Sequence, residues 1–311
     1  MVNQANYLSE TSLIKTDNLW QQVVQKTAFA RQTGALKSIE TEYKLLEQAG
    51  IPFVVRTLSN VVTKENKFKQ QKAQEAKTGK IIDPFLPYEE DLFICDISAS
   101  HFCLLNKYNV VEHHLLIVTR AFEEQTELLN ICDFEALWAC MQEIDGLAFY
   151  NGGEEAGASQ RHKHLQLIPL PFIPHAVDLP PIEAAIANID FNGSITKIPA
   201  FPFRHAIAPL DLTGVKDTVA GAKIMFDCYR NLLTAVGWNI KSDCQQQPGA
   251  YNFLATKNWM LIVPRSHGKF ETISVNSLGF AGSLFVRDRN SWERLKEVTP
   301  MTVLSQVAHN F

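Results

Sequence analysis

Hydrophobic residues recur with helical spacing in three parts of the chain, over residues 17–31, 133–146 and 217–236. Each segment begins at an aspartate and ends at or shortly before a glycine, residue types that commonly start and end helices. These segments therefore predict helices with one buried face. Residues 38–50 predict a further short helix, and Thr299-Pro300 predicts the start of a final one.

Short apolar runs between turn-forming residues predict strands. They lie at residues 52–56, 92–97, 102–105, 114–119 and 147–150. The second, third and fourth runs follow one another closely, which favours an antiparallel meander. Residues 251–265 share the rhythm of residues 105–120, and we interpret this as a weak internal repeat of one strand pair. Helices mixed with antiparallel strands predict an α+β fold.

The stretch from Asn151 to Ile168 contains the most informative polar pattern. Its second part alternates polar and apolar residues as a half-buried strand does, so His162, His164 and Gln166 are expected on one face. Same-face neighbours on a strand lie about 7 Å apart, so a phosphate could contact two or three of them. The first part is rich in glycine, and its backbone can turn tightly and point several N–H groups toward an anion.

Alternating histidines of this kind have three chemical interpretations. They can ligate a metal, although Gln166 then occupies the third position and an amide is a poor zinc ligand. They can be structural residues whose ring nitrogens are hydrogen-bonded. Alternatively, an unprotonated imidazole can attack phosphorus and form a transient phosphoramidate. A neutral Gln166 would then donate to a phosphoryl oxygen without readily passing on a proton, which favours transfer over hydrolysis.

Composition and charge narrow the possible partners. The chain has 311 residues, is 46% hydrophobic and 20% charged, and carries a net charge of −4. This balance argues against binding to nucleic acid or to an anionic membrane, and small anionic ligands remain possible. The six cysteines form no C-x-x-C pair, which favours reduced thiols over disulfides or a four-ligand zinc site. Because the chain shows neither a secretory leader nor a long apolar span, we predict a cytoplasmic location.

The proline-rich segment from Pro169 to Pro181 is the best candidate for a boundary. It divides the chain into an N-terminal catalytic half, residues 1–181, and a C-terminal half, residues 182–311. The second half repeats the strand pair without the histidine row. We therefore expect it to complete a pocket in which the first half reacts.

Two further features are open to more than one interpretation. Lysines are concentrated between Lys64 and Lys80, where they either form a solvated loop or helix face or close over a polyphosphate. Asn106 follows the run 102–105, a position typical of an asparagine that caps a turn. The adjacent His113 and His114 cannot share one face of a strand and make a poor metal pair.

The sequence His162-Lys-His-Leu-Gln166, preceded by Gly157-Ala-Ser-Gln160 and by Asn151, resembles the transferase branch of the histidine-triad superfamily. Within that branch it is most similar to the diadenosine tetraphosphate (Ap4A) phosphorylases, also called ATP adenylyltransferases. Looser matches extend the resemblance from about Pro52 to Arg265: Asp83-Pro-Phe-Leu-Pro87, Leu105-Asn-Lys107 and His113-His-Leu-Leu-Ile-Val-Thr119. The resemblance implies an α+β, histidine-triad-like fold in which two related halves form one extended antiparallel sheet with flanking helices.

The resemblance also implies roles for individual residues. His164 is the implied nucleophile that takes AMP from the substrate, with His162 orienting it and Gln166 holding the α-phosphate. Asn106 matches the ribose-binding position of the superfamily, and Lys64, with Lys67 as its competitor, matches a lysine that contacts polyphosphate. The remaining implied nucleotide- or phosphate-binding residues are Asn151, Gly157, Ala158, Ser159, Gln160, Asn252, Thr256, Met260 and Arg265.

The implied reaction is the reversible phosphorolysis of Ap4A, in which His164 attacks an α-phosphorus, ATP leaves and phosphate takes the adenylyl group to give ADP. The expected partners are nucleotides and phosphate, with Mg²⁺ on the polyphosphate and no protein-bound zinc. Hexose-1-phosphate uridylyltransferases share His-x-His-x-Gln but have proline where Lys163 stands and often have zinc-binding cysteines, which makes a sugar-nucleotide enzyme the weaker alternative. A non-catalytic nucleotide sensor and a metal-dependent phosphoesterase are the rivals from other classes. The sequence does not indicate an oligomeric state.

Overall fold

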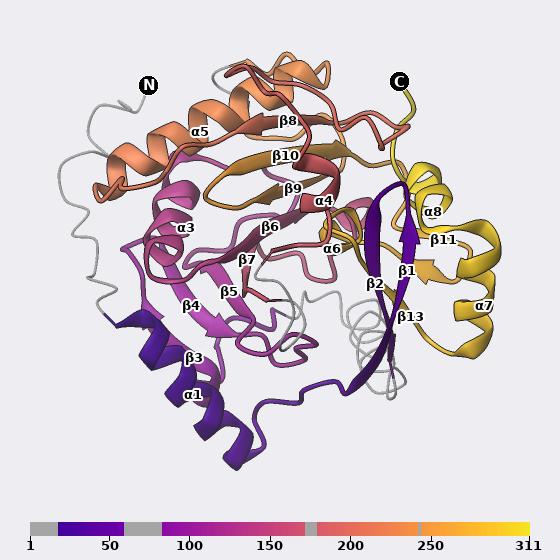
Figure 1. Ribbon diagram of the computed structural model, residues 1–311. Helices are drawn as coiled ribbons and strands as arrows, with labels where there is room; N and C mark the ends of the chain where they lie inside the picture. The colour runs from indigo at the N-terminus through magenta and orange to yellow at the C-terminus, as the bar shows by residue number, and fades with distance from the viewer. Residues whose placement is uncertain (1–17, 59–82, 172–178, 242–243) are drawn as a thin grey trace.

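An eight-stranded sheet forms the centre of the computed structural model, which describes residues 18–58, 83–171, 179–241 and 244–311 (Figure 1). Its strands follow the order β3-β4-β5-β7-β6-β9-β10-β8, and each is antiparallel to its neighbours. The predicted α+β fold with one extended antiparallel sheet is confirmed. The strands are β3 (Phe93–Asp96), β4 (His101–Leu105), β5 (Leu115–Thr119), β6 (Gly146–Gly152), β7 (His164–Pro169), β8 (Ala206–Pro209), β9 (Tyr251–Ala255) and β10 (Trp259–Pro264).

The two halves of the chain meet inside this sheet, where β6 pairs with β9. At this seam Asn151 lies opposite Asn252. The predicted repeat is present as two antiparallel pairs, β4 with β5 in the first half and β9 with β10 in the second. The predicted boundary at residue 181 stays a prediction, and strands from both sides of it share one sheet.

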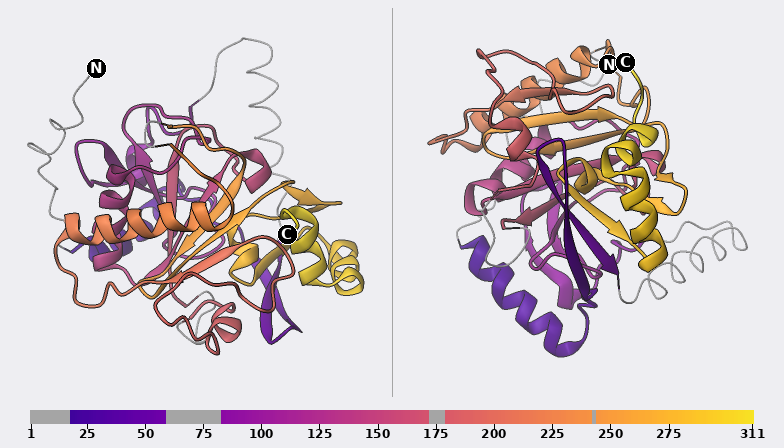
Figure 2. Two further views of the ribbon diagram at one scale, coloured as in Figure 1. Left: turned by 90° about the horizontal axis from the view of Figure 1, so that it is seen from above. Right: turned by 45° about the vertical axis from the view of Figure 1, so that its right-hand side comes forward.

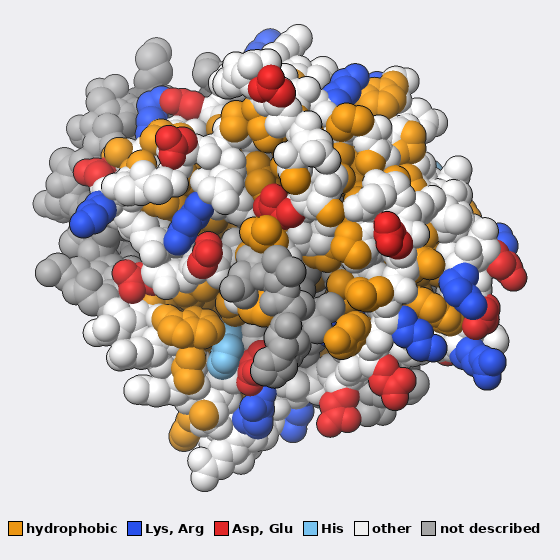
Figure 3. Space-filling view, in the orientation of Figure 1, with side chains coloured by type: hydrophobic (Ala, Val, Ile, Leu, Met, Phe, Trp, Pro, Cys, Tyr) orange, Lys and Arg blue, Asp and Glu red, His pale blue; other side chains and the backbone are white. Residues whose placement is uncertain are grey.

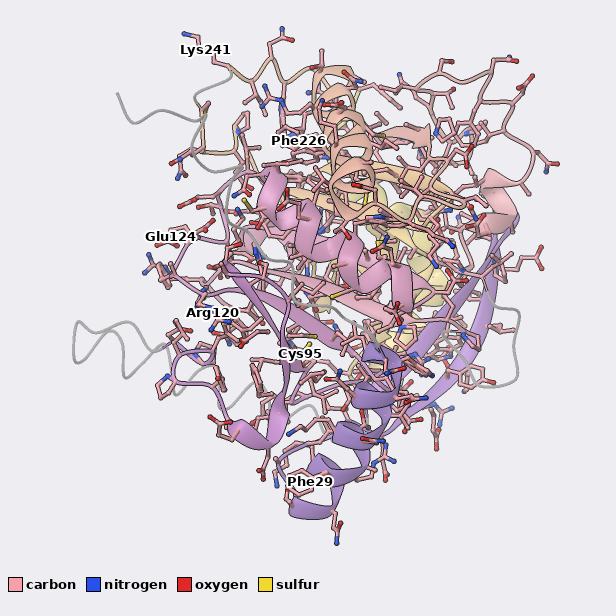
Figure 4. All side chains as sticks on the ribbon, turned by 90° about the vertical axis from the view of Figure 1, so that its left-hand side faces the viewer. Phe29, Cys95, Arg120, Glu124, Phe226 and Lys241 are labelled. Carbon is pink, nitrogen blue, oxygen red and sulfur yellow. The ribbon has the colours of Figure 1, made fainter. Side chains whose placement is uncertain are left out.

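Three helices cover one face of the sheet: α1 (Leu19–Thr33), α3 (Ile131–Glu143) and α5 (Thr218–Ala235). They lie side by side across that face in Figure 4, where Phe29 marks α1 and Phe226 marks α5. Every second residue of the central strands packs against them in one buried core, as Leu165 of β7 and Met260 of β10 do. Removal of such apolar surface from water stabilises the fold by roughly 25 cal/mol per Å².

The opposite face of the sheet carries two separate apolar clusters. The larger one packs β6, β9 and β10 against a second sheet and the C-terminal helices (Figure 2). The smaller one joins Phe85 to side chains of β4 and β5. The histidine row lies between the two clusters. The second sheet consists of β1 (Thr41–Gln48), β2 (Ile51–Leu58) and β13 (Ser283–Val286), and the remaining elements are η2 (Glu90–Leu92), η3 (Glu154–Ala156), α4 (Glu183–Ile186), β11 (Lys269–Phe270), β12 (Ile273–Ser274), α6 (Ser277–Phe280), α7 (Arg289–Val298) and α8 (Pro300–Val307).

The predicted helix over residues 38–50 is wrong, because residues 41–48 form strand β1. This strand pairs with β2 along its length through a turn at Ala49 and Gly50, whose φ angles of 53° and 76° suit a two-residue hairpin. β2 in turn pairs in parallel with β13 from the end of the chain. Pairing with the adjacent strand β2, which β13 holds on its other side, therefore outweighs the helical spacing of residues 38–50.

The other predicted helices are present, with changes at their ends. The N-cap of α3 is Asn130 and not Asp133, because the Asn130 side chain accepts from the Cys132 and Asp133 N–H groups. Trp20 and Val24 of α1 are 38% and 40% exposed, although their spacing predicted burial. α8 begins at Pro300 as predicted. Asp17 and the lysine run 64–80 lie outside the described residues.

Acidic and basic side chains are interspersed over the face of the molecule shown in Figure 3. Such a mixed surface agrees with the small net charge of −4. None of the helices in the described ranges combines the length and the apolar character that a membrane crossing requires.

Candidate active site

Strand β7 and the residues just before it present the histidine row on the face opposite the three covering helices. His164 and Gln166 lie on β7, and His162 precedes it. Leu165, between them, packs into the helix-side core, so the predicted alternation of faces is confirmed. The ring of Phe85 lies 5.1 Å from that of His164 and 5.8 Å from that of His162, between centroids. Phe85 therefore covers the histidines from the side of β4 and β5.

His164 has the environment of a nucleophile. Its Nδ1–H donates to the backbone carbonyl of His162 at 2.8 Å, and because a carbonyl only accepts, the neutral ring keeps its lone pair on Nε2. Burial lowers the pKa of His164 to about 4, with the hydrogen bond to the His162 carbonyl opposing this shift and the nearby His162 ring adding to it. The ring is therefore neutral at pH 7. Within the described part of the chain Nε2 has no hydrogen-bond partner.

The ring of His162, unlike that of His164, has a hydrogen-bond partner at both nitrogens among the described residues. Its Nδ1 lies 2.8 Å from the Asp83 carboxylate, and its Nε2 lies 2.8 Å from the Thr119 carbonyl. The Thr119 hydroxyl also lies 3.0 Å from this Nε2. His162 thus orients His164 through its backbone, while its ring ties the segment at Asp83 to β5.

Gln166 is oriented by a residue outside the motif. Its Oε1 accepts from Nε2–H of His114 at 2.9 Å, and its Nε2 makes no hydrogen bond within the described residues. Asn106 lies on the other side of the His114 ring, at 3.2 Å from Nδ1. Asn106 also accepts from the Tyr108 N–H, which confirms the turn-capping interpretation. The contact of Asn106 with ribose stays a prediction.

The Gln125 side chain separates β6 from β7 beside His164. The two strands pair as far as Phe149 and Gln166, and the next residues on this face are Asn151 and His164. There the Gln125 amide accepts from the His164 N–H at 2.9 Å and donates to the carbonyls of Asn151 and His164 at 3.0 and 3.2 Å. Gln125 is 2% exposed, so it fixes the backbone of His164 from inside the protein.

The glycine-rich turn between β6 and β7 uses several of its own N–H groups in hydrogen bonds within the turn. Those of Ala156, Gly157 and Ala158 donate to carbonyls earlier in the turn, so the expectation that they point toward an anion is wrong. Ser159 is exposed, and its N–H and hydroxyl make no hydrogen bond among the described residues. Gln160 beside it is half-buried.

Gly157 is required where this turn touches the second half of the chain. Its φ angle is 91°, which L-residues with a side chain rarely adopt. A Cβ atom would also lie 2.8 Å from the Val275 carbonyl oxygen. The close approach of Gly157 to Val275 therefore depends on the missing side chain.

Asn151 is held by the second half of the chain. Its Oδ1 accepts from Nδ2 of Asn252 at 2.9 Å and from the N–H and hydroxyl of Ser277 at 2.9 and 2.8 Å. Its own Nδ2 has no partner within the described residues. The second half thus fixes this amide with its nitrogen available to a ligand, which suits the predicted phosphate contact of Asn151.

Arg265 and Asn252 use all of their N–H donors on the protein. The Arg265 guanidinium donates to the side chain of Asn252 and to the carbonyls of residues 156, 267, 275 and 307. Asn252 donates to Asn151 and to the Ala156 carbonyl. Burial lowers the pKa of Arg265 to about 9, which leaves it charged at neutral pH. Both residues support the turn, and neither has a donor left for the nucleotide contact that was predicted.

Two other predicted residues of the second half serve the fold. Met260 is fully buried in the helix-side core, on the opposite face of the sheet from the histidine row, so it does not line the pocket. The Thr256 hydroxyl accepts from the Asn258 N–H and caps the turn between β9 and β10. Lys64 and Lys67 lie outside the described residues.

A buried charge network lies behind the row, on the helix side of β7. Lys163 pairs with Asp133 of α3 at 2.7 Å and with Glu123 at 3.0 Å, and Asp133 also contacts His101 at 3.0 Å. Burial raises the pKa of Asp133, but Lys163 and His101 outweigh it and lower this pKa to about 2. The network ties β7 to α3 and so holds the strand that carries His164.

Among residues 18–58, 83–171, 179–241 and 244–311, no group of three or more His, Cys, Asp or Glu side chains could hold a metal ion. All six cysteines are free thiols. The chemistry that the described groups support is attack by a neutral imidazole, assisted by amide donors.

Sequence reasoning missed three residues that shape this site: His114, Gln125 and Ser277. The alternation along β5 could have placed His114 on the same face as the row, once β5 was paired with β7. Gln125 and Ser277 act from a loop and a helix start through contacts that no local pattern signals.

The chain is similar to known proteins over most of its length. The sequence profile described as "Ap4A phosphorylase N-terminal domain" matches residues 9–188, and the profile described as "ATP adenylyltransferase C-terminal domain" matches residues 199–310. "Diadenosine 5',5'''-P1,P4-tetraphosphate phosphorylase 2" of Saccharomyces cerevisiae is 29% identical and aligns with 90% of this chain and 91% of its own. "Protein APA1" of the same yeast is 24% identical over 88% and 87%.

Solved structures agree with the sequence relatives. The crystal structure of yeast Ap4A phosphorylase Apa2 superposes with a TM-score of 0.76 at 25% identity, covering 96% of this chain and 99% of that one. The structure of the same enzyme in complex with AMP gives 0.76 at 26% identity, over 96% and 98%. The resemblance drawn from the motifs is confirmed, and the chain belongs to the Ap4A phosphorylase family of nucleotidyltransferases.

Proposed function

We propose that the chain catalyses the reversible phosphorolysis of Ap4A to ATP and ADP through an adenylyl group carried on His164. The relatives support the substrate, since the yeast enzyme Apa2 has also been solved in complex with Ap4A. One observation carries the mechanism. His164 is neutral and buried, its Nδ1–H is bonded to a carbonyl, and its Nε2 lone pair has no partner in the described part of the chain.

In the first step Nε2 of His164 attacks an α-phosphorus of Ap4A. The N–P bond forms, the P–O bond to the β-phosphate breaks, and ATP leaves. The ring gains positive charge, which the bond from its Nδ1–H to the His162 carbonyl stabilises. The amide nitrogens of Gln166 and Asn151 donate to the non-bridging oxygens of the transferred group, where negative charge is concentrated.

In the second step an oxygen of inorganic phosphate attacks the same phosphorus. The N–P bond breaks, ADP leaves, the proton of hydrogenphosphate passes to solvent, and the His164 lone pair is restored. Mg²⁺ is proposed to accompany the substrate polyphosphate, whose clustered charges need neutralisation. The cytoplasmic location stays a prediction, as does the absence of nucleic-acid and membrane partners.

Incubation with Ap4A and ³²P-labelled phosphate tests this function. We expect labelled ADP and unlabelled ATP in equal amounts. Formation of AMP and ATP without uptake of label would contradict phosphorolysis. Without phosphate, ATP release should stop at one equivalent per chain, and the chain should keep an acid-labile, alkali-stable adenylyl group that is missing from the His164→Ala variant.

A further inference from the structure

A path of hydrogen bonds from Tyr108 through Asn106 and His114 to Gln166 runs in a single direction. The backbone N–H of Tyr108 donates to Oδ1 of Asn106 at 3.2 Å. The amide nitrogen of Asn106 lies 3.2 Å from Nδ1 of His114, and Nε2 of His114 lies 2.9 Å from Oε1 of Gln166. This series of contacts starts at the backbone N–H of Tyr108 and ends at the Gln166 side chain in the candidate site.

The starting group decides the direction of every later bond. A backbone N–H only donates, so it fixes which end of the Asn106 amide is the oxygen. The nitrogen end then donates to Nδ1 of His114, which must hold a lone pair. The ring hydrogen of His114 is therefore on Nε2, and it donates to the oxygen of Gln166. The nitrogen of Gln166, which has no partner within the described residues, is left available to a ligand.

We propose that His114 is a positioning residue that holds the Gln166 amide with its nitrogen toward the transferred phosphoryl group. This inference rests on the proposed function. An unrestrained amide can rotate and present its oxygen, which repels phosphoryl oxygens, because its two ends are similar in shape. His114 and Gln166 are 7% and 9% exposed, so water competes little for their bond. The Phe149 ring, 5.8 Å from that of His114, restrains the imidazole.

A double-mutant cycle tests the role of His114. His114→Phe should lower kcat by about 30-fold with a smaller change in KM, because the amide loses its orientation. In a Gln166→Ala background the same substitution should change kcat by less than about twofold, since there is no amide left to orient. Losses that multiply in the double variant would show that His114 acts independently of Gln166, and would overturn the proposal.

Two further variants separate positioning from structural damage. His114→Gln offers an amide donor near the place of Nε2 and should recover at least about fivefold in kcat over His114→Phe. Equal kcat values for His114→Gln and His114→Phe, in folded proteins, would count against positioning. The matched control is His113→Phe, because His113 contacts Thr27 and Trp20 of α1 and should leave kcat within about twofold.

The protonated nitrogen of His114 can be measured without turnover. The ¹⁵N chemical shifts of its ring in the unmodified chain should show hydrogen on Nε2 and a lone pair on Nδ1. Hydrogen on Nδ1 would overturn the proposal whether or not Ap4A is cleaved. If the unmodified chain forms no ADP from Ap4A and phosphate, the proposed function fails, and the ring measurement still decides the arrangement around Gln166.

Discussion

Strand β7 and the segment that leads into β8 each carry a buried histidine, and the two residues are alike in most respects. His164 is 5% exposed and His205 is 2% exposed. Each donates its Nδ1–H to the carbonyl two residues earlier, at 2.8 and 2.7 Å. Burial lowers the pKa of both to about 4.

The difference between the two histidines lies at Nε2. In His205 this nitrogen accepts from the Ile198 N–H at 2.7 Å, whereas in His164 it has no partner among the described residues. Burial and a fixed tautomer therefore produce a neutral imidazole in both places. Only the unshared lone pair of His164 is available for the proposed attack, so the partner of each nitrogen says more about function than burial does.

Replacement of each histidine gives the largest contrast. His164→Ala should lower phosphorolysis by about 10⁴-fold or more, because the attacking atom is lost. His205→Gln should keep activity within about threefold and lower the free energy of unfolding, since it disturbs bonds that serve only the fold. ADP formation and urea unfolding measure the two effects. Substantial turnover by folded His164→Ala would end the nucleophile assignment.

Arg265 and Asn151 differ in a similar way. All N–H donors of Arg265 are bonded to the protein, whereas Nδ2 of Asn151 has no partner among the described residues. Arg265→Met should lower the free energy of unfolding by about 4 kcal/mol, because it leaves several buried acceptors unpaired. Urea denaturation measures this loss. The control is Arg294→Met on the surface of α7, which should barely move the urea midpoint. An Arg265→Met protein of unchanged stability but raised KM would instead favour direct nucleotide binding.

The two histidines should resemble each other in acid. A histidine in the unfolded chain has a pKa near 6.5, and both folded values are about 4, so the unfolded state binds protons first. Their contribution to stability is complete above about pH 6.5 and is lost as the pH falls toward 4, by up to about 3 kcal/mol each. Urea midpoints at pH 7 and pH 5 should differ less in His205→Gln than in the unmodified chain. An identical pH dependence would contradict the low pKa of His205.

Gln125 tests how closely His164 must be placed. Gln125→Ala removes the amide that holds both backbone groups of His164, and we expect kcat to fall by about 10²-fold. Steady-state kinetics measure this, with thermal unfolding to verify folding. The matched control is Gln142→Ala, since Gln142 bonds carbonyls of the loop before α5, away from the site. Equal kinetics in both variants would show that β7 holds His164 unaided.

The spacing of apolar residues predicted those helices and strands that have one apolar and one polar side. The alternation around His164 placed the row correctly because β7 is apolar on one side and polar on the other. Residues 41–48 were mistaken for a helix, although the strand at residues 52–56 was predicted, because the spacing of their apolar residues does not show that they pair with β2. The direction of the N–H groups in the glycine-rich turn was also wrong, since hydrogen bonds within the turn compete for the same donors.

The sequence likewise placed some residues of the candidate site correctly and misjudged others. Motif spacing pointed to His164 and Gln166, each of which has a side-chain nitrogen without a partner among the described residues. It also suggested Arg265 and Met260 as nucleotide-binding residues. In the structure Arg265 donates to Asn252, which supports the glycine-rich turn, and Met260 packs in the helix-side core. A residue type at a matching position cannot show whether its donors are already engaged. That information exists only after folding brings distant segments together.

The bond between Asn151 and Ser277 has a consequence for the synthesis of the chain. These residues are 126 positions apart, so the amide of Asn151 is fixed only after most of the second half has left the ribosome. A nascent chain that already contains His164 and Gln166 still has an unpaired β6 edge and an unanchored glycine-rich turn. Catalytic competence should therefore arise late in translation and together with the final fold, so that truncated chains do not consume nucleotides.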